Sequence, residues 1–160
     1  MSAFKRFSAI LAASLMLATL LPAPAASALC YSNNNKEKEF TRLMNNARHN
    51  NDKGTLILDP ELSKAAKKHT TEMVNRNTLY HTESGDLRHR VTNWSTLGEN
   101  VGVGSTVDSL HTAFMNSPAH KENILFTSFK YVGVGTKEAN GRLWVTVIFE
   151  ASANPGSPLC

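Results

Sequence analysis

Apolar residues recur at intervals of three and four along residues 33–51, 56–77 and 105–116, which predicts three amphipathic helices. The second segment also carries start signals, because Asp59 can act as N-cap and Pro60 is tolerated in the first turn. The inward positions are Phe40, Leu43, Met44 and Ala47 in the first helix, Leu62, Ala65, Ala66, His69 and Met73 in the second, and Val107, Leu110 and Phe114 in the third.

Two histidines fall within these predicted helices. His69 lies on the inward face and is expected to be a core histidine with a hydrogen-bonded ring, rather than a ligand. His111 is expected on the outer side of its helix. Residues 83–93, which separate the second helix from the third, are expected to form a loop with a short helical turn.

A Ser-Pro pair interrupts the third helix and starts a fourth. Ser117 is a suitable N-cap, and Pro118 occupies the first helical position, where its missing N–H costs nothing. This restart places His120 in the first turn of the new helix.

The last third of the chain changes from helical to strand periodicity. Residues 129–137 and 142–151 flank an Asn140-Gly141 pair, which is a strong signal for a β-hairpin turn. The tetrapeptide Val-Gly-Val-Gly occurs at 101–104 and again at 132–135. Both copies are predicted to be strands whose missing side chains let another element approach closely. The predicted class is α+β, with helices on both sides of a small antiparallel sheet.

The N-terminus is typical of a secretory signal peptide. Lys5 and Arg6 precede an apolar run at 9–21, and small residues follow up to a cleavage site after Ala28. The run is shorter than the roughly 20 residues that span a bilayer, although a retained anchor is the alternative. We therefore predict a secreted, extracellular protein with no transmembrane segment in its mature form. The predicted units are a signal peptide (1–28), an N-terminal segment (29–37), one domain (38–150) and a tail (151–160).

The charge balance argues against nucleic-acid binding. The chain has a formal charge of +4, with 17 basic and 13 acidic residues. Cleavage would remove Lys5 and Arg6 and leave 15 basic residues, so the mature charge would be about +2. No cluster of Lys and Arg in the sequence marks a groove-binding face. A weak preference for anionic cell envelopes is the most that this charge supports.

Two cysteines remain after cleavage, Cys30 and Cys160, at the two ends of the mature chain. In an oxidising compartment an even count suggests one bridge between them. Closing so long a loop would contribute about 4–5 kcal/mol in the chain-entropy model. Free thiols and an intermolecular bond are the alternatives.

Three polar residues serve no packing pattern and are candidates for chemistry. His81 follows the second helix, Glu99 lies beside a Gly-rich strand, and His120 lies in the restarted helix. Two imidazoles and a carboxylate are typical of a site for Zn²⁺ or another divalent cation, with an open position for water or substrate. Spacing alone does not bring the three together, and isolated solvated side chains are the alternative.

Several short motifs follow one another along residues 38–150. They are Leu62-x-x-Ala65-Ala66-x-x-His69-x-x-x-Met73, Tyr80-His81-Thr82, Gly98-Glu99-Asn100-Val101, Met115 to His120 followed by Asn123-Ile124-Leu125, and Val132-Gly133-Val134-Gly135. Their order and spacing resemble the CAP superfamily of cysteine-rich secretory, antigen 5 and pathogenesis-related-1 proteins, in its bacterial branch. The resemblance implies an α-β-α sandwich with a central cleft in which His81, Glu99 and His120 are cleft residues. Eukaryotic members usually add a second glutamate, and here Ser117 takes that place.

These observations favour a non-enzymatic binding module over an enzyme. Its cleft would hold a divalent cation or a ligand such as a lipid or a cell-envelope component, as the resemblance implies. The alternative is a metal-assisted hydrolase with Glu99 as general base. That role is disfavoured because Glu99 cannot be both a tight ligand and a free base, and no second acid is present. A third possibility is a structural envelope protein whose cleft residues only hydrogen-bond one another.

Overall fold

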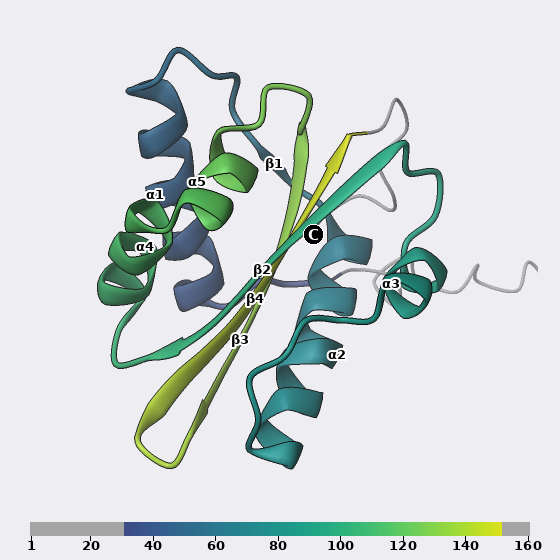
Figure 1. The fold of residues 1–160 in the computed structure, drawn as a ribbon, viewed down its shortest axis with the longest axis vertical. Coiled ribbons are helices and arrows are strands. Elements are labelled where there is room, and N and C mark those ends of the chain that lie inside the picture. Colours follow the sequence, from purple (N-terminus) through teal and green to yellow (C-terminus); the bar gives the residue numbers. More distant parts are fainter. Residues whose placement is uncertain (1–30, 152–160) are drawn as a thin grey trace, which may run out of the picture.

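The computed structural model describes residues 31–151, which form helices on both sides of a central sheet (Figure 1). The predicted signal peptide and both cysteines lie outside the described residues. The elements, in chain order, are α1 (Asn35–His49), β1 (Ile57–Leu58), α2 (Pro60–Arg76), α3 (Ser84–Arg90), β2 (Thr96–Gly104), α4 (Val107–Asn116), α5 (Pro118–Leu125), β3 (Tyr131–Ala139) and β4 (Arg142–Ala151).

The predicted α+β class, with helices on both sides of a small sheet, is confirmed, but the sheet is mixed rather than purely antiparallel. Its strand order is β1-β3-β4-β2, and the three long strands pair antiparallel as expected. The two-residue strand β1, however, pairs parallel to β3, with Ile57 opposite Tyr131. This pairing joins residues far apart in the sequence, so local periodicity could not show it. The hairpin turn is confirmed, since Asn140 and Gly141 both have positive φ angles, 52° and 68°.

The helix ends follow the predicted signals with two exceptions. Asp59 caps α2 by accepting a hydrogen bond from the Leu62 N–H. Residues 83–93, predicted as a loop with a short turn, contain the seven-residue helix α3. Ser117 is the N-cap residue of α5, but its side chain makes no capping hydrogen bond.

The two helical layers pack against opposite faces of the sheet, as Figure 1 shows, with α1, α4 and α5 on one side and α2 and α3 on the other. Both Val-Gly-Val-Gly copies are strands, as predicted. A Cβ atom on Gly133 or Gly135 would overlap the backbone of α2, whereas one on Gly102 would lie 3.0 Å from the Phe114 ring in α4. The larger hydrophobic cluster of the core includes Phe40, Met44, Leu110, Phe114, Ile124 and the sheet residues Val132, Val134, Val145, Val147 and Phe149.

A buried arginine joins α1 to the C-terminal end of α5. Arg48 is 1% exposed, and its guanidinium donates hydrogen bonds to the carbonyl oxygens of Ile124 (2.8 Å), Phe126 (3.0 Å) and Phe129 (3.1 Å), and also to Gly54. Burial lowers the pKa of this guanidinium from its usual value. Because the carbonyl groups satisfy its donors, Arg48 fixes the chain that leaves α5.

His111 faces α1, which corrects the prediction that it lies on the outer side of its helix. Its ring meets the Phe40 ring edge to face at 6.2 Å, and its Nε2 is buried without a hydrogen-bond partner. Burial lowers the pKa of His111, and the nearby Asp108 acts in the opposite direction. Neutral His111 therefore belongs to the packing between α1 and α4.

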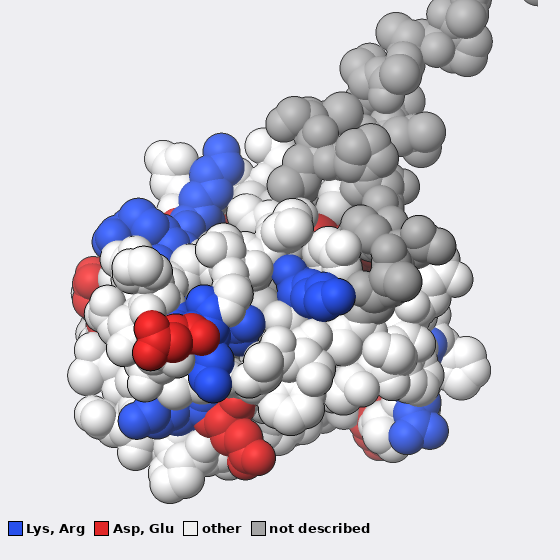
Figure 2. All heavy atoms as spheres, turned by 90° about the horizontal axis from the view of Figure 1, so that it is seen from above, with Lys and Arg blue, Asp and Glu red and all other residues white. Residues whose placement is uncertain are grey.

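None of the helices within residues 31–151 is both long and apolar enough to cross a membrane. On the face that Figure 2 shows, acidic and basic side chains intermingle rather than forming one area of a single sign.

Replacing Gly135 by alanine should strongly destabilise the fold. The added methyl group would meet the backbone of Ala66 and Lys67, which no side-chain rotation can relieve. We expect a loss of about 3 kcal/mol or more, at the upper end of overpacking effects. Urea denaturation measures this change. Gly54→Ala is the control, because nothing lies within 4 Å of its added Cβ; equal losses in both variants would contradict the close packing of α2 on β3.

His111 should make the folded state sensitive to mild acid. Its folded-state pKa lies below the unfolded value near 6.5, so the unfolded chain binds the proton more readily. The free energy of unfolding should therefore fall as the pH drops below about 6.5 and through the lower folded pKa. His111→Gln should reduce this loss between pH 7 and pH 5, measured by urea denaturation at each pH. His49→Gln, at an exposed position, should leave the loss unchanged; the reverse pattern would contradict the buried placement.

Candidate functional site

Three segments bring the candidate residues to the edge of the sheet at β2. Glu99 lies in β2, His81 lies in the segment between α2 and α3, and His120 lies in the first turn of α5. Figure 1 shows β2 between α5 on one side and the segment that follows α2 on the other. The site therefore forms where the two helical layers meet over an edge strand.

The Glu99 carboxylate is held by three hydrogen bonds. Its Oε1 accepts from the Thr82 backbone N–H (2.8 Å) and bonds to His81 Nδ1 (2.9 Å), while its Oε2 accepts from the Thr82 hydroxyl (2.6 Å). The Glu99 side chain is only 6% exposed. Hydrogen bonds to an ionised acceptor are the stronger kind, so this carboxylate has a fixed orientation.

His81 extends from Glu99 towards solvent, and its side chain is 59% exposed. When the ionised carboxylate accepts from Nδ1, that nitrogen carries the proton, and the lone pair of neutral His81 lies on Nε2. No hydrogen bond to Nε2 comes from any residue between 31 and 151. His81 Nε2 is thus an exposed acceptor, and the Glu99 carboxylate fixes the orientation of its ring.

His120 is positioned from the other side of β2. Its ring packs against the Phe114 ring with centroids 4.7 Å apart, and its backbone carbonyl accepts from the buried Asn100 side chain (3.0 Å). Asn123 in α5 donates to Asn100 Oδ1 (2.8 Å) and to the Glu99 carbonyl (3.2 Å). These hydrogen bonds from asparagine side chains fix the first turns of α5 against β2.

The two imidazoles interact electrostatically. Burial lowers the pKa of His120, and the nearby His81 lowers it further. Both causes favour the neutral ring, which is the form that can donate a lone pair to a metal. The ring of His120 has no hydrogen-bond partner within the described part of the chain.

The structure does not assemble all the predicted ligands around one point. In residues 31–151, no group of three or more His, Cys, Asp or Glu side chains is arranged to hold a metal ion. The Glu99 carboxylate is hydrogen-bonded to Thr82 and His81, so in this arrangement it supports a histidine. Ser117, the fourth predicted site residue, makes no side-chain hydrogen bond at the cap of α5.

His69 is the core residue that the sequence predicted. It is 1% exposed, its Nε2 bonds to the Tyr80 carbonyl (2.8 Å), and its ring meets the Tyr80 ring edge to face at 4.9 Å. Its Nδ1 lies 3.5 Å from a Glu72 oxygen, without the geometry of a hydrogen bond. His69 therefore anchors the segment that carries His81, with one ring nitrogen satisfied.

Three positioning residues were not identified from the sequence. Thr82, Asn100 and Asn123 make the hydrogen bonds that hold Glu99 and His120. Each lies within a motif that carries the family resemblance, and two of them are direct neighbours of His81 and Glu99. Their adjacency to candidate residues was the available signal, but their roles depend on contacts between distant segments.

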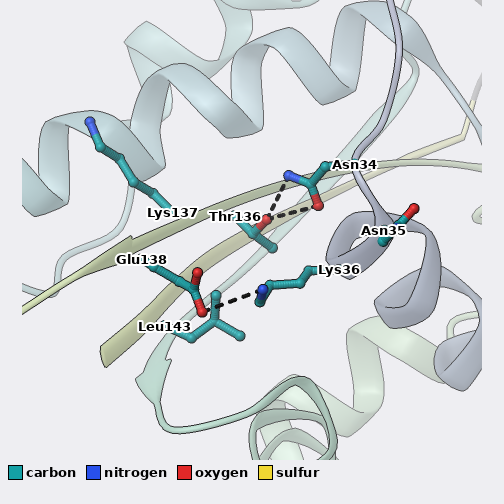
Figure 3. Close-up of a pocket in the computed structure, with 7 residues that line it drawn as sticks. All are labelled: Asn34, Asn35, Lys36, Thr136, Lys137, Glu138 and Leu143. Atoms are coloured by element: carbon teal, nitrogen blue, oxygen red, sulfur yellow. Dashed lines mark hydrogen bonds and ion pairs between the residues drawn. The ribbon is translucent and has the colours of Figure 1, made fainter. Parts of the chain in front are cut away.

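Two cavities lie away from the pair of imidazoles. One, of about 180 Å³, lies behind the segment that carries His81; its lining includes Thr82, His69 and Arg90 but none of the three candidates. The other, of about 310 Å³, lies beside the start of α1, where Figure 3 shows Lys36 paired with Glu138 at 3.4 Å. Neither of these two cavities is lined by His81, Glu99 or His120.

Comparison with known proteins identifies the family. The family model for the cysteine-rich secretory protein family, CAP, matches residues 41–149. The uncharacterized protein YkwD of Bacillus subtilis is 30% identical over 115 residues, which cover 68% of this chain and 44% of that protein. The chain therefore spans less than half the length of this curated relative.

Solved structures show the same fold. An outer surface protein from Borrelia burgdorferi has a TM-score of 0.66 and 21% identity, covering 72% of this chain and 91% of that one. An extracellular protein containing a SCP domain from Bacillus anthracis also has a TM-score of 0.66, at 22% identity, covering 73% of this chain and 40% of that one. By the matched family model and the shared fold, the chain belongs to the CAP family of cysteine-rich secretory proteins.

Proposed function

We propose that this protein is a secreted, extracellular binding module that holds a divalent cation between His81 and His120. The signal-like N-terminus supports this location, as does the similarity of the fold to an outer surface protein and to an extracellular protein. The single observation that carries the binding role is the bond between His81 Nδ1 and a Glu99 carboxylate that Thr82 holds in place.

The donor set fits Zn²⁺ or a related cation. Histidines that bind metals usually donate their other ring N–H to a carboxylate or carbonyl group, as His81 does to Glu99. The second imidazole, His120, lies near enough to His81 for the two rings to interact, and its own neutral form is favoured. Two imidazoles leave the remaining positions of the cation for water or a ligand, which is the chemistry that such a cation would supply.

Catalysis as a hydrolase is the second candidate and has less support. A general base needs a lone pair that faces the reacting proton, whereas the Glu99 carboxylate already accepts three hydrogen bonds. Lipid binding also remains a prediction. The exposed large apolar side chains Ile57, Leu79, Trp94 and Phe126 come from four separate segments.

Zn²⁺ binding should be measurable at pH 7.5 and much weaker near pH 5, because protons compete for both imidazoles. Isothermal titration calorimetry measures the affinity, and the melting temperature should rise when the cation binds. His81→Ala and His120→Ala should each abolish most of both effects.

The control for this experiment is His89→Ala, because His89 is exposed on α3 and bonds locally to the Gly85 carbonyl. His111 is unsuitable as a control because its ring is partly buried between helices. Absence of Zn²⁺ binding at pH 7.5, or unchanged binding in both alanine variants, would contradict the proposal.

Thr82→Val should weaken Zn²⁺ binding although Thr82 is not a ligand. The substitution removes the hydroxyl that donates to Glu99 Oε2 at 2.6 Å but keeps the shape and the backbone N–H. Loss of the direct hydrogen-bond partner of a metal-binding histidine, here Glu99, typically costs roughly 10–100-fold in affinity, and loss of the Thr82 hydroxyl behind it should cost no more than that. Calorimetry on Thr82→Val, with Thr78→Val as the exposed control, measures this loss.

If Glu99 were instead a free general base, Thr82→Val would leave Zn²⁺ affinity unchanged, and the purified protein would hydrolyse peptides or glycans. Activity that depends on Glu99 would then favour the hydrolase.

A further inference from the structure

The solvent face of α2 gathers positive charge without acidic partners. Lys64, Lys67 and Lys68 are all exposed and recur at intervals of three and four, so they share one face of the helix. Within residues 31–151, none of these lysines forms an ion pair with a carboxylate. The structure therefore shows a basic cluster that the sequence analysis did not identify.

The carboxylates that border this cluster are already engaged. Glu61 accepts hydrogen bonds from the Thr92 N–H (3.2 Å) and hydroxyl (3.0 Å). Glu72 accepts from the Arg90 guanidinium at 3.0 and 3.2 Å. Neither carboxylate lies within ion-pair distance of a lysine of the cluster. Lys67 Nζ lies 5.7 Å from the centroid of the Tyr31 ring, a contact that leaves its positive charge without an acidic partner.

Two hollows flank the lysines. One, of about 350 Å³, is bounded by Tyr31 and all three lysines together with Thr71 and Glu72. The other, of about 330 Å³, lies towards α3 and shares Lys64 and Lys68 with the first; Glu61, Ala65, His89 and Arg90 complete its lining. The lysines form a ridge between the two hollows. Such a relief suits a linear polymer that lies along the ridge better than it suits a flat partner.

The helix that carries the lysines is held rigidly. Its opposite face packs against Gly133 and Gly135 so closely that no side chain fits between them. The positions of the lysine backbones are thus fixed by the core, which reduces the ordering cost when a ligand binds.

We propose that the face formed by Lys64, Lys67, Lys68 and the two flanking hollows, the α2 basic face, binds a linear anionic polymer with phosphodiester repeats. A chain of repeated charges can contact several lysines at once and release its counterions. A membrane is a poorer fit, since the exposed apolar side chains Ile57, Leu79, Trp94 and Phe126 line neither hollow. Single-stranded nucleic acid is also a poorer fit, because among residues 31–151 Tyr31 and His89 are the only aromatic side chains that line these hollows.

This proposal is independent of the metal site. The lysines and the hollows include none of His81, Glu99 or His120. The polymer should therefore bind equally well with and without Zn²⁺, and failure of one proposal leaves the other standing.

The test uses the purified chain and a short synthetic poly(glycerol phosphate), with binding measured by fluorescence anisotropy. Three phosphate contacts predict that the affinity falls about 20-fold between 50 and 200 mM salt. The triple variant Lys64→Gln, Lys67→Gln, Lys68→Gln should weaken binding by at least about tenfold at 50 mM salt and lose most of the salt dependence.

A charge-matched control separates this face from net charge. Lys38, Lys121 and Lys130 are also exposed and form no ion pair among the described residues. Changing all three to glutamine alters the net charge equally and should change the affinity less than about twofold. Thermal unfolding of both triple variants checks that each remains folded.

Equal losses in the two triple variants would overturn the proposal, because binding would then follow net charge alone. No loss in the α2 variant would overturn it as well. Tighter binding to phosphatidylglycerol vesicles, or to single-stranded DNA with the same number of phosphates, would assign this face to a membrane or to nucleic acid instead. Glycerol phosphate monomer should bind far more weakly than the polymer, and equal binding of the two would exclude a polymer site.

Discussion

The close approach of α2 to β3 is the constraint on which the site depends. Gly133 and Gly135 lack the side chains that would otherwise hold the helix away from the strand. The same contact, at Leu62 and at Ala66, fixes the N-terminal half of α2 and so sets the direction in which the helix runs towards the segment that follows it. His69 in α2 bonds to the Tyr80 carbonyl, so the position of His81 follows from helix-to-sheet packing rather than from the loop itself. Fixing a functional side chain through the core in this way favours a preorganised site.

The other Val-Gly-Val-Gly copy allows a helix to approach the opposite face of the sheet closely. Gly102 and Gly104 in β2 lie against Phe114 and Leu110 of α4, which precedes α5 directly. The bond between Asn100 and Asn123 then ties α5 to the same strand. One repeated tetrapeptide thus lets helices approach both faces of the sheet. As a result, a histidine from each layer reaches the edge where Glu99 lies.

Much of this fold follows from local signals, and the rest depends on distant contacts. The cap at Asp59, the restart at Pro118 and the turn at Asn140 were predictable because each rests on a few neighbouring residues. Strand β1 was missed because two apolar residues carry no period and pair with a strand far along the chain. His111 was misplaced on polarity alone, although it follows Val107 by four residues and so shares its buried face.

For the candidate site, the sequence indicated which residues to consider but not what each of them does. Sequence patterns identified His81, Glu99 and His120, but treated Glu99 as a ligand or a base. The structure gives its carboxylate three donors, two of them from Thr82, and leaves it 6% exposed. A carboxylate hydrogen-bonded in this way stabilises the protonated Nδ1 of its histidine and is itself held in place beside that nitrogen. The arrangement therefore orients one imidazole towards solvent, which is why we propose the binding of a cation rather than the transfer of a proton.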